Sequence, residues 1–365
     1  MKRTQLLVSF IGWLVVAGMI QQATGMSAGL TLVLFGAATM LLAMTRPSIT
    51  GVMKMESVDV QMWAREITKR FWKMNLFTNY MFDEGQYVVG GAAVLIPQPG
   101  ARADTVKNRT VYPATAVRRA DNTIMYVLDT YTTDPTHIPN VDIMSISYDK
   151  RASIIDDLFG GLLEDVSDDM LIKMANGIPK ANIVYTTGGS TEVLEEGQSG
   201  SRRAMDHLNL KKAANIMNKQ NVPKDGRVAL IEENMFDQMV DSLGANDKKD
   251  FSRVYDPASG TIGRLYGFDL MTRSSVTAAT NGVDDAVLAA VPYAAEMAAT
   301  DNVTSLCWHK NTISKALGTT RLYQDIGNPL YYGDIFSSEL RMGGRVRRAD
   351  FKGIVAISQS PVTGG

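Results

Sequence analysis

The longest periodic stretch of the sequence predicts one helix over residues 149–176. Its apolar residues recur every four positions, at Ile154, Leu158, Leu162, Val166, Met170 and Met174. This is the spacing of a single helix face. Asn176-Gly177 followed by Pro179 is a typical helix end. At about 1.5 Å per residue the helix would be about 40 Å long, and no other stretch restricts the fold so strongly.

A hairpin with a basic loop is predicted upstream of this helix. The segment 85–100 is apolar and ends in prolines, and 123–133 is rich in β-branched and aromatic residues, so both are expected to be strands. Between them, 101–122 is polar and locally basic. Two Xaa-Pro pairs over 134–139 predict a stiff turn. The period of two over 141–148 predicts a half-buried strand that leads into the helix.

The remaining segments indicate a mixed α+β body without an internal repeat. An amphipathic stripe over 62–75 has helical spacing, and Asn209 can cap a second helix. The stretch 185–203, rich in Gly and Ser, is expected to be a loop. Further predicted elements are a buried strand at 228–231, a helix at 235–243, strands within 260–276 and 303–310, and a final apolar strand before Ser358.

Composition excludes some classes of function. The chain of 365 residues has 45% hydrophobic and 21% charged residues, which is ordinary for a globular protein. Its formal net charge is -1, from 37 Lys+Arg and 38 Asp+Glu, whereas a dedicated nucleic-acid binder normally carries a basic excess. A single cysteine, Cys307, cannot form an internal disulfide, which favours a reducing compartment.

No motif for metal binding, nucleotide binding or nucleophilic catalysis is complete. Cys307 and His309 fall short of the four ligands of a structural zinc site. The stretch 186–191, "TTGGST", lacks the lysine of a phosphate-binding loop. "GQSGS" at 197–201 does not match the nucleophile elbow of hydrolases. No catalytic residue, cofactor-binding residue or metal site is therefore expected.

The first 55 residues form a separate apolar segment. No charged residue lies between Arg3 and Arg46, and the runs 6–20 and 26–44 approach the length of membrane-spanning helices. Three interpretations are open: a membrane hairpin, a processed leader, or a mis-assigned start with the true one near Met53 or Met55.

Taken together, the order of these features resembles the major capsid proteins of tailed bacteriophages, the Hong Kong 97-type family whose fold encapsulin shells share. The resemblance covers about 56–360. It is carried by "VDVQMWAREITKRFWKMNLF", "TVKNRTVYPATAVRRADNTIMYVLDTYTTDPT", "SYDKRASIIDDLFGGLLEDVSDDML", "LNLKKAANIMNKQNVPKDGRVALIEENMFDQMV", "RLYGFDLMTRSSV" and "NPLYYGDIFSSELRMGGRVRRADFKGIVAIS".

The resemblance implies an α+β, Hong Kong 97-like major capsid protein fold. Its parts would be an N-terminal arm, an extended loop, a peripheral domain with a long spine helix, and an axial domain. The implied boundaries are 1–55 for the apolar segment, 56–100 for the arm and its helix, 101–130 for the extended loop, 131–187 for the peripheral domain, 188–300 for mainly the axial domain, and 301–365 for the return to the peripheral domain.

The implied function is structural. The chain would assemble with itself into pentamers and hexamers of an icosahedral shell in the host cytoplasm and remain in the virion. A separate scaffolding protein, a portal and non-specifically contacted DNA are the other expected partners. For a shell subunit, a mis-assigned start or removed leader is preferred at 1–55, and membrane contact is not expected. An encapsulin-like compartment shell and a membrane-anchored α+β protein are the alternatives.

Charge segregation within the chain suggests the contacts between copies. A basic loop and a basic C-terminal surface accompany an acidic helix, and such complementary faces set the register between identical subunits. The candidate contact residues are Arg102, Lys107, Arg109, Arg118, Arg119, Asp156, Asp157, Glu164, Asp165, Arg341, Arg345, Arg347 and Arg348.

Overall fold

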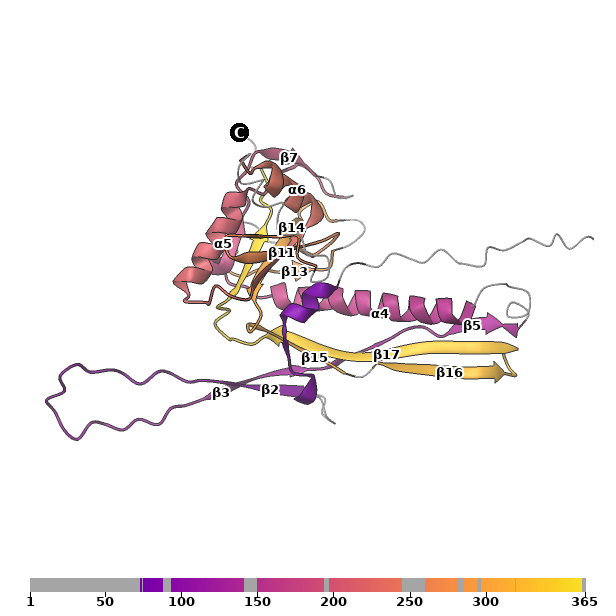
Figure 1. The fold of residues 1–365 in the computed structure, drawn as a ribbon, viewed down its shortest axis with the longest axis horizontal. Helices are drawn as coiled ribbons and strands as arrows, with labels where there is room; N and C mark the ends of the chain where they lie inside the picture. Colours follow the sequence, from indigo (N-terminus) through magenta and orange to yellow (C-terminus); the bar gives the residue numbers. More distant parts are fainter. Residues whose placement is uncertain are drawn as a thin grey trace, which may run out of the picture. The chain divides into compact units, whose positions relative to one another are not determined.

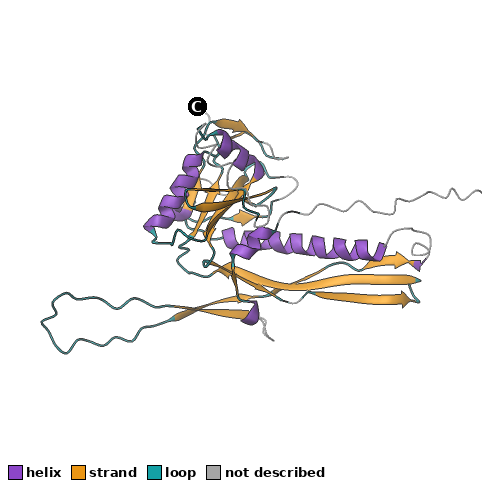
Figure 2. Cartoon of the chain, viewed as in Figure 1, coloured by secondary structure: helices purple, strands orange, loops and turns teal. Residues whose placement is uncertain are grey.

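The computed structural model describes residues 73, 75–87, 93–140, 150–193, 197–244, 260–280, 285–293, 297–318 and 320–362. All of them belong to the compact unit Trp63–Gly365. The apolar segment 1–55 and the predicted strand at 141–148 lie outside the described residues, as does nearly all of the predicted helix at 62–75. Figure 1 labels the elements and Figure 2 shows them by type.

The predicted long helix is confirmed as α4, Lys150–Ala175, which is continuous through its two central glycines. It runs beside the longest strand, β17, Gly333–Val346 (Figure 1). Leu171 and Met174 of the helix are fully buried. A side chain at Gly344 of the strand would collide with the thioether of Met170. The end of the Met170 side chain therefore occupies the space that a side chain at Gly344 would need.

Strand β17 organises the first sheet because it pairs antiparallel with four strands. β16, Arg321–Asn328, and β5, Thr136–Pro139, both pair with its first half and so lie on opposite edges. β15, Ile313–Leu317, and β4, Asp129–Thr132, pair with its second half. The short β1, Phe82–Asp83, adds to β15 in parallel, between the 3-10 turns η1, Leu76–Tyr80, and η2, Gly85–Tyr87.

The second sheet has eight strands. At its centre β9, Arg227–Glu232, lies between β11, Phe268–Arg273, and β14, Asn302–His309. β14 also pairs with β18, Ile354–Ser358, the predicted final strand, and β18 with β6, Ile183–Tyr185, which follows the 3-10 turn η3, Lys180–Asn182. The outer strands are β10, Gly263–Leu265; β12, Thr277–Ala279; and β13, Ala290–Val291.

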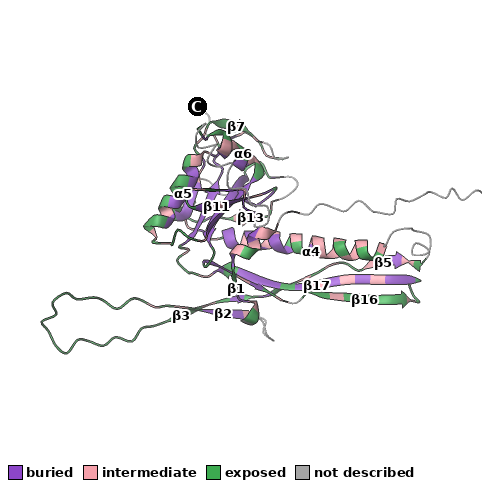
Figure 3. Ribbon diagram, viewed as in Figure 1, coloured by how far each residue is buried: buried purple, intermediate pink, exposed green. Residues whose placement is uncertain are grey.

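Two helices pack on the second sheet. α5, His207–Lys219, contacts β18 and β6, and α6, Glu233–Asp241, contacts β9 and β11. β9, β14 and β18 are buried along their whole length (Figure 3). Leu306 and Trp308 of β14 share one apolar cluster with α4 and β17, whereas Cys307 belongs to the cluster under α5 and α6. The two faces of β14 therefore pack into two different hydrophobic clusters.

Three local predictions are wrong. The stiff turn predicted over 134–139 contains strand β5, Thr136–Pro139, which pairs with β17. Helix α5 is capped by Asp206, whose side chain accepts a hydrogen bond from the backbone N of Leu208. Asn209 is the third helical residue, and its side-chain oxygen accepts a hydrogen bond from the backbone N of Asp206, which completes a capping box. The predicted loop over 185–203 contains a short hairpin of β7, Ser190–Glu192, and β8, Ser201–Arg203. Its strands are too short for a period of two to be read.

Candidate subunit interface

The predicted hairpin is formed by β2, Ala93–Gln98, and β3, Asn122–Val127, which pair antiparallel in a two-stranded sheet of their own. Val94, Ile96 and Tyr126 face inward and are buried. Leu95 and Met125, directly opposite each other on the outer face, are 63% and 55% exposed. One face of the ribbon is thus packed and the other is open.

The loop that joins these strands is exposed throughout 101–121 (Figure 3). It carries the predicted basic residues Arg102, Lys107, Arg109, Arg118 and Arg119. Between them lie Val111, Tyr112 and Val117, which are 75%, 75% and 85% exposed. Exposed apolar and aromatic side chains beside arginines are typical of a protein–protein contact.

The two ends of the loop 101–121, which we call its neck, are joined by the carboxylate of Asp121. Arg119 donates from Nε and Nη2 to the two carboxylate oxygens of Asp121, at 2.6 and 2.9 Å. The backbone N of Gly100, on the other side of the neck, donates to the same carboxylate at 2.8 Å. The hydrogen bonds from Arg119 and Gly100 lower the pKa of Asp121. A side chain at Gly100 would collide with the carbonyl of Ala120, so the two sides lie in contact.

A buried carboxylate holds the base of the hairpin. Glu84, 3% exposed, accepts hydrogen bonds from the hydroxyl of Tyr126 on β3, at 3.0 Å, and from that of Ser314 on β15. Arg347 pairs with it at 3.2 Å and stacks on the ring of Phe82. Burial raises the pKa of the Tyr126 phenol. Four segments far apart in sequence are therefore joined below the loop, and sequence analysis gave no sign of Glu84.

The acidic face of α4 is divided between internal and outward residues. Of the predicted residues, Glu164 pairs with Lys73 at 3.2 Å, Asp157 is half-buried, and Asp156 and Asp165 are exposed. Burial, followed by repulsion from Asp168 and Glu164, raises the pKa of Asp165. Asp156 and Asp165 are therefore the predicted acidic residues most open to a partner.

Two further acidic residues of α4 serve the fold. Asp168 pairs with Lys73 at 2.8 Å and with Arg273 of β11 at 2.5 Å. Asp169 pairs with Lys173 at 2.7 Å and accepts a hydrogen bond from the hydroxyl of Tyr131. These contacts tie α4 to both sheets. Apart from Lys173, which is one turn along the same helix, the partners lie 38 or more residues away in sequence, so helical periodicity gave no signal for them.

The predicted basic C-terminal surface is also divided. Arg341 is exposed and lies 3.5 Å from Glu339. Arg345 donates to the carbonyl of Met125 at 3.2 Å, and Arg347 is held by Glu84. Arg348 donates to both oxygens of Asp350, at 2.8 and 2.9 Å. Arg341 and Arg345 therefore share the exposed face of β17, whereas Arg347 and Arg348 lie beyond its end.

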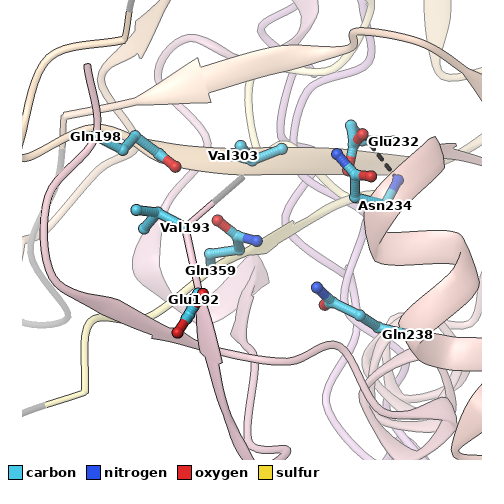
Figure 4. Close-up of a pocket in the computed structure, with 8 residues that line it drawn as sticks. All are labelled: Glu192, Val193, Gln198, Glu232, Asn234, Gln238, Val303 and Gln359. Carbon is cyan, nitrogen blue, oxygen red and sulfur yellow. Dashed lines mark hydrogen bonds between the residues drawn. The ribbon is translucent and has the colours of Figure 1, made fainter. Parts of the chain in front are cut away.

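The part of the chain that the structure describes contains no group of three His, Cys, Asp or Glu residues that could hold a metal ion. Burial raises the pKa of the Cys307 thiol and so disfavours the reactive thiolate. A small polar pocket beside α6 is lined by Glu192, Val193, Gln198, Glu232, Asn234, Gln238, Val303 and Gln359 (Figure 4). There the carboxylate of Glu232 caps α6 by accepting from the backbone N of Asn234 and Met235.

The described helices include none that is both long and apolar enough to span a membrane. Neither protein-family models nor curated protein sequences give a match to the chain.

The arrangement of α4 along β17, the projecting β2–β3 hairpin and the helix-covered second sheet is the Hong Kong 97-type major capsid protein fold, of the predicted α+β class. Among solved structures, the capsid of Ralstonia phage GP4 is similar with a TM-score of 0.61 and 12% identity, over 86% of this chain and 98% of that one. A chain from Mycobacterium phage Che8 has a TM-score of 0.54 and 16% identity, over 81% and 96%. The capsid of Cyanophage P-SCSP1u gives 0.54 and 16%, over 82% and 92%.

Proposed function

We propose that this chain is a major capsid protein, the structural subunit of an icosahedral shell that encloses the genome of a tailed double-stranded DNA bacteriophage. The fold is the first support. The observation that carries the proposal is the loop 101–121, which is exposed along its length yet held by a closed neck and a buried base. Such a preorganised projection gains its contacts from another copy at a low entropic cost.

The parts of the chain then have distinct roles. The loop within 101–130 is the extended loop that reaches a neighbouring subunit. α4 is the spine helix of a peripheral domain formed by 131–187 and 301–365. The axial domain is mainly 188–300, with α5 and α6, near the five- and sixfold axes. Its sheet is completed by β6, β14 and β18 from the flanking ranges. The role is structural and not enzymatic.

Charge complementarity sets the contacts between copies. The basic residues Arg102, Lys107, Arg109 and Arg118 of the loop meet outward acidic residues of a second copy. Asp156 and Asp165 suit this role because they are exposed on one helix. At exposed sites, such pairs guide orientation more than they add affinity. The exposed Val111, Tyr112 and Val117 supply the apolar area of the contact.

The remaining partners follow from this role. Assembly takes place in the host cytoplasm around a separate scaffolding protein and a portal, and the subunit ends in the virion. Packaged DNA is contacted without sequence preference.

Electron microscopy of the full chain expressed with its genomic neighbours tests the proposal. We expect closed icosahedral shells that fill with DNA. Shells that enclose protein instead would indicate an encapsulin-like compartment. A soluble monomer at every concentration, or a chain that sediments with membranes, would contradict both kinds of shell.

A further inference from the structure

Several turns of the second sheet meet at the C-terminal end of α5. Gln220, which caps the helix there, accepts a hydrogen bond from the backbone N of Gly353 at 3.0 Å. The carbonyl of Gly353 accepts from the backbone N of His309, also at 3.0 Å, and the carbonyl of Gly226 accepts from the backbone N of Lys310 at 2.9 Å. The end of α5 and the turns before β9, after β14 and before β18 are therefore neighbours.

These turns form a basic surface, which we call the basic turn surface. It consists of Lys219, Lys224, Lys310, Arg348 and Lys352, all of them exposed. Two acidic residues, Asp225 and Asp350, accompany them. Asp350 is already bound by Arg348, at 2.8 and 2.9 Å, and by Lys352 at 3.2 Å. The local balance is thus strongly positive although the whole chain is nearly neutral.

Three of the lysines are available for a ligand. Within the described residues, Lys219, Lys224 and Lys310 have no carboxylate at ion-pair distance. The side chain of Lys310 lies over Gly226, whose missing side chain leaves room for its methylene groups. Its ammonium group is therefore held near the turn, while Lys219 and Lys224 extend from neighbouring turns.

The chemistry of the surface favours phosphate over protein. No exposed large apolar residue lies in the described turns that carry these five basic residues, and Tyr266, 37% exposed, lies in the adjacent turn before β11. Interfaces between proteins are enriched in aromatic residues and depleted of lysine. By contrast, lysines spread over adjacent turns match the evenly spaced charges of a nucleic-acid backbone, which they contact without reading sequence.

We propose that the basic turn surface binds the phosphodiester backbone of double-stranded DNA, independently of sequence. The inference rests on the proposed function, because the shell of that proposal encloses DNA. It places the contacts with DNA at one surface and not at scattered basic residues. Lys219, Lys224 and Lys310 neutralise phosphates, and Arg348 with Lys352 adds positive potential beside them.

Salt-dependent DNA binding by the full-length chain, purified as unassembled subunits, tests this. The probe is a fluorescent 20-base-pair duplex of random sequence, titrated from about 50 to 200 mM salt. The variant Lys224→Gln/Lys310→Gln removes two charges from the surface. The control Lys211→Gln/Lys212→Gln removes two exposed charges from the body of α5. Lys224→Gln alone serves if the double variant does not fold.

We expect the negative slope of log K against log salt to become less steep by about 1.8 in the double variant and by about 0.9 in Lys224→Gln alone, because each phosphate contact contributes about 0.9 to its magnitude. The control should keep the wild-type slope. Equal slopes for wild type, variant and control would overturn the inference. So would loss of shell assembly with an unchanged slope, since the surface would then contact a second copy. Failure of the wild-type chain to form shells would instead count against the proposed function.

Discussion

Arg273 of β11 and Asp168 of α4 form an ion pair with 2.5 Å between Nη2 and Oδ1, and the arginine side chain is completely buried. Its other contacts are neutral: the carbonyl of Ser275, the side chain of Asn75 and the ring of Phe77. Asp168 thus supplies the carboxylate that balances a cation in the core between helix and sheet.

Asp168→Ala is expected to lower the free energy of unfolding by about 3–5 kcal/mol, because it leaves a buried guanidinium uncompensated. Urea denaturation of the unassembled subunit measures this. The control is Asp165→Asn on the exposed side of the same helix, expected within about 0.5 kcal/mol of wild type. Adding Arg273→Met to Asp168→Ala should restore part of the loss. A double variant no more stable than Asp168→Ala would argue against the pair.

Glu84→Leu should also destabilise the subunit by about 3–5 kcal/mol, since Tyr126, Ser314 and Arg347 would lose their common buried acceptor. Tyr126→Phe, which removes one hydroxyl, should cost about 1 kcal/mol. Chemical denaturation compares the two variants. Similar small losses would mean that Glu84 does not anchor the hairpin.

Gly100→Ala tests whether the loop must be held closed at its neck. The new methyl group would collide with the carbonyl of Ala120, so the two sides must separate. We expect reduced shell yield, measured by sedimentation, with little change in the unfolding of the subunit. Gly189→Ala is the matched control, because no atom lies within 4 Å of the added group. Normal yield from Gly100→Ala would show that assembly tolerates an open neck.

Two adjacent arginines of the loop should respond differently to charge reversal. Arg119→Glu would face Asp121, and the swap Arg119→Glu/Asp121→Arg should restore the ion pair but not the hydrogen bond from Gly100, so that the shell yield recovers in part. Arg118→Glu should lower the yield without that rescue. Adding Asp156→Lys on α4 to Arg118→Glu is expected to restore the shell yield. The new lysine of one copy can then pair with the new glutamate of another copy. Unchanged assembly with Arg118→Glu would exclude the proposed contact.

Alkaline pH should weaken the contact between α4 and β4. Burial, together with the hydrogen bond to Asp169, raises the pKa of Tyr131 to about 12, whereas in the unfolded chain it is about 10. Between these values the unfolded chain releases a proton that the folded chain keeps. The free energy of unfolding must therefore fall as pH rises from about 10 to 12. Urea midpoints of Tyr131→Phe should fall less steeply than those of wild type, and parallel curves would contradict the assignment.

Local sequence signals predicted the helices and hairpins that are formed by residues close together in the chain. The helix expected at 149–176 occupies Lys150–Ala175. The strands expected around the basic loop pair as β2 and β3. In both cases a clear period or turn residues marked the element. The start of α5 was placed at Asn209 because it is a good capping residue, but Asp206, three residues earlier, takes that role.

Long-range contacts were not predictable in the same way. β17 has 14 residues, yet its sequence drew attention only for its arginines, because glycines and serines interrupt the pattern of a strand. The acidic face of α4 suggested a surface for partners, but Lys73 and Arg273 occupy part of it from 95 or more residues away. A single sequence carries no local signal for contacts between residues so far apart in the chain.

The pairing of β17 with four other strands also has a mechanical consequence. Antiparallel hydrogen bonds run perpendicular to the strand axis, so a load along β17 strains many of them at once, in shear. The β2–β3 ribbon, pulled apart at its open end, would instead lose its six paired positions one after another. The subunit is therefore stiff along one direction and compliant at its projection. A shell of such subunits, under pressure from tightly packed contents, would yield first at its loops while the strands around β17 hold their lengths.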